Sequence, residues 1–199
     1  MTTRSIFFDR VIMVAVIVTI VVLALALIGD PVRQTLAWTR TGLERVELWR
    51  LFSGHLVHLD IYHAVLNVSI MLLLALLFGD IFTLARHSVH ALIGTLMIDA
   101  GLFWLADIEW YVGLSGVLHA IAAAVVVRLV IDRHDHITWL VALFGLSKII
   151  YENTFGAMPF SGSTSAVATD GHLFGVLAGM MFGLVPDGRR KRKNFNDLA

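Results

Sequence analysis

Long apolar runs separated by short polar connections dominate the chain. An apolar run of about 18 to 20 residues can cross a bilayer as a helix. Six runs fit this pattern, although the last two are short or interrupted: Val11 to Ile28, Leu59 to Gly79, Val89 to Ala106, Val112 to Ile131, Ile137 to Tyr151 and Gly171 to Pro186. The pattern predicts an all-α integral membrane protein, with one domain over residues 1–199 built as a bundle of six transmembrane helices.

The basic residues predict how these helices are oriented, because lysine and arginine concentrate in cytoplasmic connections. They stand before the first run, after the second, at the end of the fourth and after the last: Arg4, Arg10, Arg86, Arg128, Arg133 and the basic tail 187–199. We therefore expect cytoplasmic N- and C-termini. The first run has no small-residue cleavage site before Asp30-Pro31, so we interpret it as a retained span and not as a signal peptide.

The connection 30–58 does not follow the charge rule. It carries four arginines on the side predicted to be extracytoplasmic, namely Arg33, Arg40, Arg45 and Arg50. Its apolar and polar positions alternate, which predicts short amphipathic helices lying at the membrane interface, where arginine stems can extend along apolar surface.

Composition narrows the possible chemistry. The chain is 58% hydrophobic and 15% charged, with a mean hydropathy of +0.81, far more apolar than an average soluble domain. Its formal net charge of zero and the absence of a basic groove argue against a nucleic-acid partner. The chain has no cysteine, which excludes disulfides, thiolate nucleophiles and cysteine metal sites.

Polar residues inside the predicted spans converge on the outer leaflet. They come from four spans: His63 and Asn67, Ser115 and His119, Lys148 and Glu152, and His172. Such groups are costly in a bilayer and are functional candidates. If Trp110 and Tyr111 mark the interface, Ser115 lies about 6 to 8 Å deeper, at 1.5 Å per residue. This convergence predicts a half-buried active site.

Ser115 lies in Gly113-Leu114-Ser115-Gly116, a string that by itself favours close helix packing over catalysis. Glycines recur every fourth residue at 171, 175, 179 and 183, so packing of Gly116 and Ala120 on this ridge brings Ser115 level with His172. The chemical hypothesis is a dyad of nucleophile and general base. No carboxylate is evident, because Asp170 and His172 point apart on a helix. His119 is a rival base, restricted because it shares the helix of Ser115.

The remaining polar pairs leave alternatives open. His63 and Asn67 are four residues apart and could donate hydrogen bonds to an oxyanion, or could bond to loop backbone instead. Lys148 and Glu152 could neutralise each other or face substrate near the site. Asp99 has no evident partner. His55, His58 and His63 cluster, but no His-Glu-x-x-His string exists, and we expect no metal and no cofactor.

Four motifs in order resemble the rhomboid family of intramembrane serine proteases. They are Trp49-Arg50 followed by Gly54-His55-Leu56-Val57-His58, then His63-Ala64-Val65-Leu66-Asn67, Gly113-Leu114-Ser115-Gly116, and Gly171-His172 with Gly175 and Gly179. The resemblance covers nearly the whole chain after the first span. It implies a rhomboid-like bundle with Ser115 as nucleophile, His172 as base, and His63 and Asn67 at the oxyanion hole.

Within this family the chain resembles the bacterial rhombosortases. The resemblance rests on His119 after Gly-Leu-Ser-Gly-Val-Leu, on Lys148-Ile149-Ile150-Tyr151-Glu152, and on the compact length; Ala120 and Asp170-Gly171 depart from the pattern. It implies exported substrates that end in Gly-Gly, an apolar helix and a basic tail, cleaved at the outer leaflet of the bacterial inner membrane. The expected partners are these anchored proteins and membrane lipid. The alternatives are a non-catalytic rhomboid-like protein that binds transmembrane segments, and a haem or metal protein.

Overall fold

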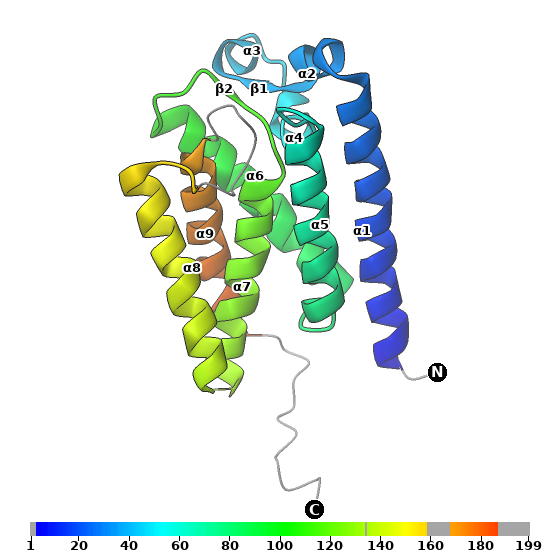
Figure 1. Ribbon diagram of the computed structural model, residues 1–199, viewed down its shortest axis with the longest axis vertical. Coiled ribbons are helices and arrows are strands. Elements are labelled where there is room, and N and C mark those ends of the chain that lie inside the picture. The colour runs from blue at the N-terminus through cyan, green and yellow to red at the C-terminus, as the bar shows by residue number, and fades with distance from the viewer. Residues whose placement is uncertain (1–2, 134, 159–167, 187–199) are drawn as a thin grey trace, which may run out of the picture.

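Six long helices form the body of the protein in a computed structural model, which describes residues 3–133, 135–158 and 168–186, with side chains from residue 9 onward. They are α1 (Thr3–Ile28), α5 (Ile61–Phe78), α6 (Leu84–Trp104), α7 (Ser115–Arg133), α8 (His136–Phe155) and α9 (Thr169–Gly183). Figure 1 shows α1, α5, α7, α8 and α9 side by side, with α6 running obliquely behind α7 and α5. The mostly helical fold is confirmed.

Three of the described helices are long and apolar enough to cross a membrane on length and composition alone. They are Asp9–Ile28 within α1, Ile61–Phe78 and Ser115–Arg133. Helices α6, α8 and α9 carry more polar side chains or are shorter, which keeps them below the same criterion. The six crossings and the cytoplasmic termini therefore remain predictions.

Short elements cover one end of the bundle. The connection after α1 forms α2 (Asp30–Leu36), β1 (Trp38–Thr39), α3 (Arg40–Glu44) and α4 (Arg50–Ser53), which lie at the top of Figure 1. Strand β1 pairs antiparallel with β2 (Trp110–Tyr111), so that Trp38 lies opposite Tyr111. This two-residue pairing was not expected from the all-helical pattern. It ties the first connection to the segment that leads into α7.

Three of the four arginines of this connection bind backbone carbonyls. Arg40 donates to the carbonyls of Leu102 and Ala106, at 3.1 and 2.9 Å, where α6 ends. Arg33 donates to the Leu59 carbonyl, and Arg50 donates to the Ala37 carbonyl. The last carbonyls of a helix lack intrahelical donors. Backbone carbonyls that need hydrogen-bond donors thus give a physical reason for these three arginines, which the charge rule does not explain.

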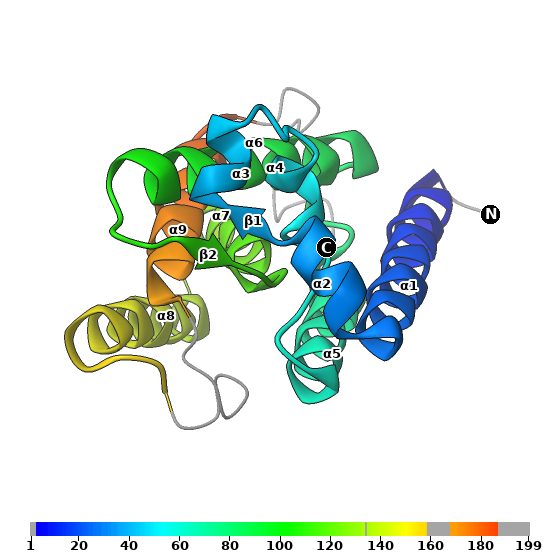
Figure 2. The same cartoon turned by 90° about the horizontal axis from the view of Figure 1, so that it is seen from above.

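Helix α7 packs on α9 through the predicted glycine ridge. A Cβ on Gly175 would collide with the Gly116 carbonyl oxygen, and one on Gly179 would collide with the Ala120 carbonyl oxygen. The backbones are therefore in close contact, as small residues permit. Figure 2, looking along the bundle, shows α7 beside α9, with α8 and α1 at opposite sides. This part of the prediction is confirmed.

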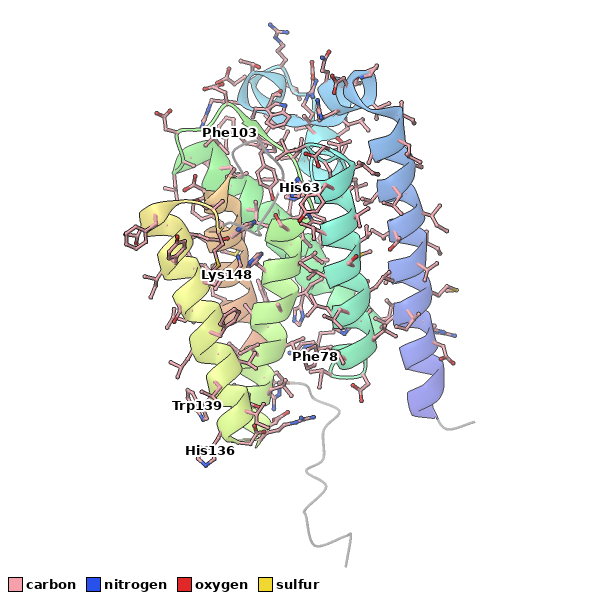
Figure 3. The ribbon with its side chains drawn as sticks, viewed as in Figure 1. His63, Phe78, Phe103, His136, Trp139 and Lys148 are labelled. Carbon is pink, nitrogen blue, oxygen red and sulfur yellow. The ribbon has the colours of Figure 1, made fainter. Side chains whose placement is uncertain are left out.

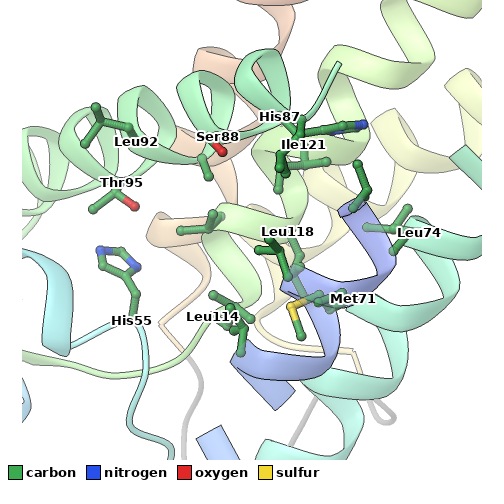
Figure 4. A pocket seen from close by; sticks show the side chains of 18 of the residues that line it. His55, Met71, Leu74, His87, Ser88, Leu92, Thr95, Leu114, Leu118 and Ile121 are labelled. Carbon is green, nitrogen blue, oxygen red and sulfur yellow. The ribbon is translucent and has the colours of Figure 1, made fainter. Parts of the chain in front are cut away.

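A second face of α7 borders an apolar cavity of about 380 Å³. The cavity lies between α1, α5, α6 and α7, and Figure 4 labels Leu118 and Ile121 of α7 together with Leu114, which directly precedes this helix. The residues of α7 that face the glycine ridge of α9 do not line this cavity. The cavity is thus separate from the α7–α9 contact, where Ser115 and His172 lie.

Candidate active site

Ser115 is the first residue of α7, at the end of a segment that descends from β2 into the bundle (Figure 1). The turn depends on Gly113, whose φ of 120° lies in the region that side chains rarely adopt. A Cβ on Gly113 would also lie 2.9 Å from Cε1 of His63. Glycine at this position lets the chain bend and lets the His63 ring lie against the backbone just before Ser115.

The structure brings Ser115 and His172 together. The Oγ atom of Ser115 lies 2.8 Å from Nε2 of His172, which is hydrogen-bond distance. His172 is buried at the start of α9, beside the first glycine of the ridge. The close approach of α7 and α9 sets this distance.

The prediction that no carboxylate accompanies this pair is wrong. Glu152, from α8, places Oε2 2.9 Å from Nδ1 of His172, and its side chain is fully buried. The same oxygen lies 2.7 Å from Nζ of Lys148. Sequence spacing showed only the Lys148–Glu152 pair, because the contact with His172 depends on how α8 is rotated against α9. The only signal was that the three residues share one predicted depth.

His119 contacts Ser115 through backbone and not through the hydroxyl. Its Nδ1 lies 2.7 Å from the Ser115 carbonyl oxygen, so Nδ1 carries the hydrogen. Its Nε2 then presents a lone pair to the Lys148 ammonium group, 3.0 Å away. The His119 ring stacks on His172, with centroids 4.3 Å apart. In Figure 3, Lys148 lies on the face of α8 turned toward α7 and α9. His172 is thus the imidazole that touches the Ser115 hydroxyl.

His63 and Asn67 are both buried on α5. Figure 3 labels His63 near the upper end of this helix. Asp60 caps this helix by accepting from the His63 amide at 2.7 Å. Asn67 donates to the His63 carbonyl at 2.9 Å, which uses one of its two amide hydrogens. Among the described residues, neither ring nitrogen of His63 has a hydrogen-bond partner. Both side chains therefore keep a donor available beside the segment that leads to Ser115.

Asp99 has a partner that the sequence did not reveal. Its Oδ1 lies 3.1 Å from Nε2 of His55, and both side chains are buried. His58 instead donates from Nδ1 to the Leu56 carbonyl and accepts at Nε2 from the Leu114 amide. The histidines that cluster in sequence therefore have separate roles in packing the first connection against α6 and α7.

One group in the described part of the chain has the spacing of a metal site. The ligand atoms of His119, Glu152 and His172 lie within 4.8 Å of one another. The Lys148 ammonium group already contacts two of them, as the distances above show. A metal ion at this position would have to displace a lysine cation, so the donor set suits a protonated lysine better than a metal.

Comparison with known proteins gives the family. The Rhomboid domain family model matches residues 45–186, which include α5 to α9 and every polar residue of the site. The chain belongs to the rhomboid family. Rhomboids are generally intramembrane serine proteases, and the apolar helices of this rhomboid agree with a membrane location. A search of curated proteins returns no match.

Proposed function

We propose that this rhomboid is an intramembrane serine endopeptidase with Ser115 as nucleophile and His172 as general base. The observation that carries the proposal is the 2.8 Å contact between Ser115 Oγ and His172 Nε2. A hydroxyl is a weak nucleophile until a neighbouring base takes its proton. Membership of a family of intramembrane proteases supports the same reaction.

In the first step, Ser115 Oγ attacks the carbonyl carbon of the scissile peptide bond while its proton passes to Nε2 of His172. The carbon–nitrogen bond then breaks, and His172 returns the proton to the leaving amine, which gives an acyl enzyme and a new N-terminus. Water attacks the acyl enzyme with His172 again as base. This second step releases a C-terminal carboxylate and restores the Ser115 hydroxyl.

The negative charge that develops on the attacked carbonyl oxygen needs hydrogen-bond donors to stabilise it. Ser115 begins α7, so its amide has no acceptor within the helix, and the helix N-terminus favours a negative charge. The free donors of His63 and Asn67 lie on the neighbouring helix. We propose that these three groups form the oxyanion hole.

We further propose that the substrates are exported proteins of the rhombosortase type, anchored by a C-terminal Gly-Gly motif, apolar helix and basic tail. Support comes from His119, Lys148 and Glu152, the residues that resemble rhombosortases, which contact Ser115 or His172 directly or through one another. The outward face of α8 carries exposed apolar side chains such as Leu140, Leu143 and Phe144, over which a transmembrane segment can approach. The site would open to the extracytoplasmic side of a bacterial inner membrane.

The test is cleavage of a reporter with that tripartite C-terminus, in cells and with purified protein in detergent or liposomes. We expect Ser115→Ala and His172→Ala to abolish cleavage, while a fluorophosphonate probe labels the parent at Ser115. His119→Ala should retain measurable cleavage, because His119 does not contact the hydroxyl. Cleavage by Ser115→Ala at the parental rate would rule out the nucleophile. Binding of the reporter without labelling or cleavage by the parent would favour a non-catalytic protein.

A further inference from the structure

The polar contacts do not stop at His172 but return to Ser115 and close a ring. From the hydroxyl the ring runs through His172, Glu152, Lys148 and His119, and it ends at the carbonyl oxygen of Ser115. Each of the five contacts is between 2.7 and 3.0 Å. Three helices contribute, so the ring joins α7, α8 and α9 at the depth of the nucleophile.

The ring determines which ring nitrogen of each histidine carries the hydrogen. A carboxylate accepts, so Nδ1 of His172 donates to Glu152, and the lone pair of His172 lies on Nε2, facing the serine hydroxyl. This is the tautomer that a general base needs. Lys148 donates both to Glu152 and to His119, so it occupies the lone pair of His119. The ring therefore favours a single arrangement of protons at rest.

The charge of the buried Glu152 explains why the ring includes Lys148. The Glu152 side chain is fully buried, and an isolated carboxylate in such a place would take up a proton. The ammonium group of Lys148, with its side chain 23% exposed, keeps Glu152 as an anion. A simple neutralising pair needs nothing more, but here the same Glu152 oxygen also faces His172. The pair is thus part of the site and not a separate structural bridge.

We propose that Glu152 is a positioning residue for His172, and that Lys148 and His119 hold Glu152 and the His172 ring in place. The proposal rests on the proposed function. When Ser115 attacks, its proton moves to Nε2 and His172 becomes an imidazolium cation. Glu152 stays ionised and stabilises that cation through Nδ1–H, and the proton leaves His172 only when it passes to the amine. The ring turns the expected dyad into a Ser–His–Glu arrangement supported by a lysine.

The deciding variant is Glu152→Gln, which keeps the shape of the side chain and removes its charge. We expect kcat on the tripartite reporter to fall at least ~10²-fold, the scale of a lost contribution to acid–base catalysis, with KM within about threefold of the parent. Lys148→Met should lower kcat in the same direction, and Lys148→Arg should restore part of it, because a guanidinium group also donates to a carboxylate. A structural role alone would not produce this difference between methionine and arginine.

The pH profile gives a second readout. The acid limb of kcat/KM reports loss of the free base, so Glu152→Gln should move that limb to lower pH, because the imidazolium has lost its counter-charge. Four other titratable or charged groups belong to the helices packed around His172 or to its own helix. They are His119 on α7, Lys148 on α8, His63 on α5 and Asp170 on α9. A Lys148→Met profile measured alongside separates the contribution of the lysine charge from that of Glu152.

The matched control is Asp132→Asn, which removes a carboxylate bonded to an arginine four residues away on α7, far from Ser115. It should leave kcat and the acid limb unchanged. A thermal melt of each purified variant checks folding, and Glu152→Asp supplies a second variant if the glutamine form unfolds. Parental kcat and an unshifted acid limb in folded Glu152→Gln would overturn the proposal. With Ser115→Ala still inactive, that outcome leaves the proposed function standing.

Discussion

At the scale of single residues, the position of Ser115 depends on a histidine that does no chemistry. His58 is buried and connects two backbone segments, with Nδ1 donating to Leu56 and Nε2 accepting from the Leu114 amide at 3.4 Å. Burial, with a smaller effect of the nearby His63 in the same direction, lowers the pKa of His58 from 6.5 to about 3. A neutral His58 therefore holds the backbone one residue before the nucleophile.

This gives a pH prediction with a definite sign. The unfolded chain takes up a proton on His58 below pH 6.5 and the folded chain only near pH 3, so the stabilisation is complete above pH 6.5 and is lost as the pH falls. Between pH 6.5 and pH 5 the loss amounts to about 2 kcal/mol. His58→Gln, measured by equilibrium unfolding in detergent at pH 8, 6.5 and 5, should show a stability curve flatter by that amount. Parallel curves for parent and variant would contradict the assignment.

At the scale of elements, the contact of α7 with α9 was predictable and the contact of α8 with α9 was not. Glycines at every fourth position mark one helix face whatever the rest of the fold does, and that face packs on Gly116 and Ala120. Glu152 reaches His172 only because α8 presents one particular face to α9. Spacing within a helix says nothing of its rotation against another helix, so Glu152 was predicted as the partner of Lys148 or as a group facing substrate, and not as a partner of His172.

Alanine substitutions at two glycines, one in the glycine ridge of α9 and one outside it, should affect stability differently. Alanine at 179 places a methyl group against the Ala120 carbonyl oxygen and Cβ of Ala123, so the helices must separate. We expect Gly179→Ala to lose roughly 1 to 3 kcal/mol of stability and to reduce cleavage, because Ser115 moves away from His172. A methyl group added to Gly145, on α8, would instead meet nothing within 4 Å beyond the neighbouring residues and backbone of its own helix.

Gly145→Ala is therefore the matched control. It should be neutral or stabilising by up to about 1 kcal/mol, the difference in helix propensity between the two residues. Melting temperatures of both variants, with initial rates on the reporter, provide the comparison. Equal losses in the two variants would mean that the glycines of α9 matter for reasons other than contact with α7.

At the scale of the whole molecule, hydropathy located the six long helices of the described residues but not the short elements that cover one end of the bundle. The β1–β2 pair joins residues about 70 positions apart and the arginine contacts to α6 join residues about 60 positions apart, and no local pattern encodes such pairings. The same holds for Asp99, whose partner His55 lies 44 residues earlier. The convergence of polar groups was visible because depth in a bilayer follows from position along each span.

Orientation in the membrane can be tested directly because the chain has no cysteine, so single cysteines can be introduced without other changes. Glu44 and Asp107 are exposed near the end that carries the short elements, whereas Asp80 and His136 are exposed at the other end (Figures 1 and 3). The positive-inside rule places the second pair in the cytoplasm. In intact spheroplasts, a membrane-impermeant maleimide should label Glu44→Cys and Asp107→Cys, and should label Asp80→Cys and His136→Cys only after permeabilisation. The reverse pattern, in variants that still cleave the reporter, would place Ser115 near the cytoplasmic leaflet and exclude exported anchors as its substrates.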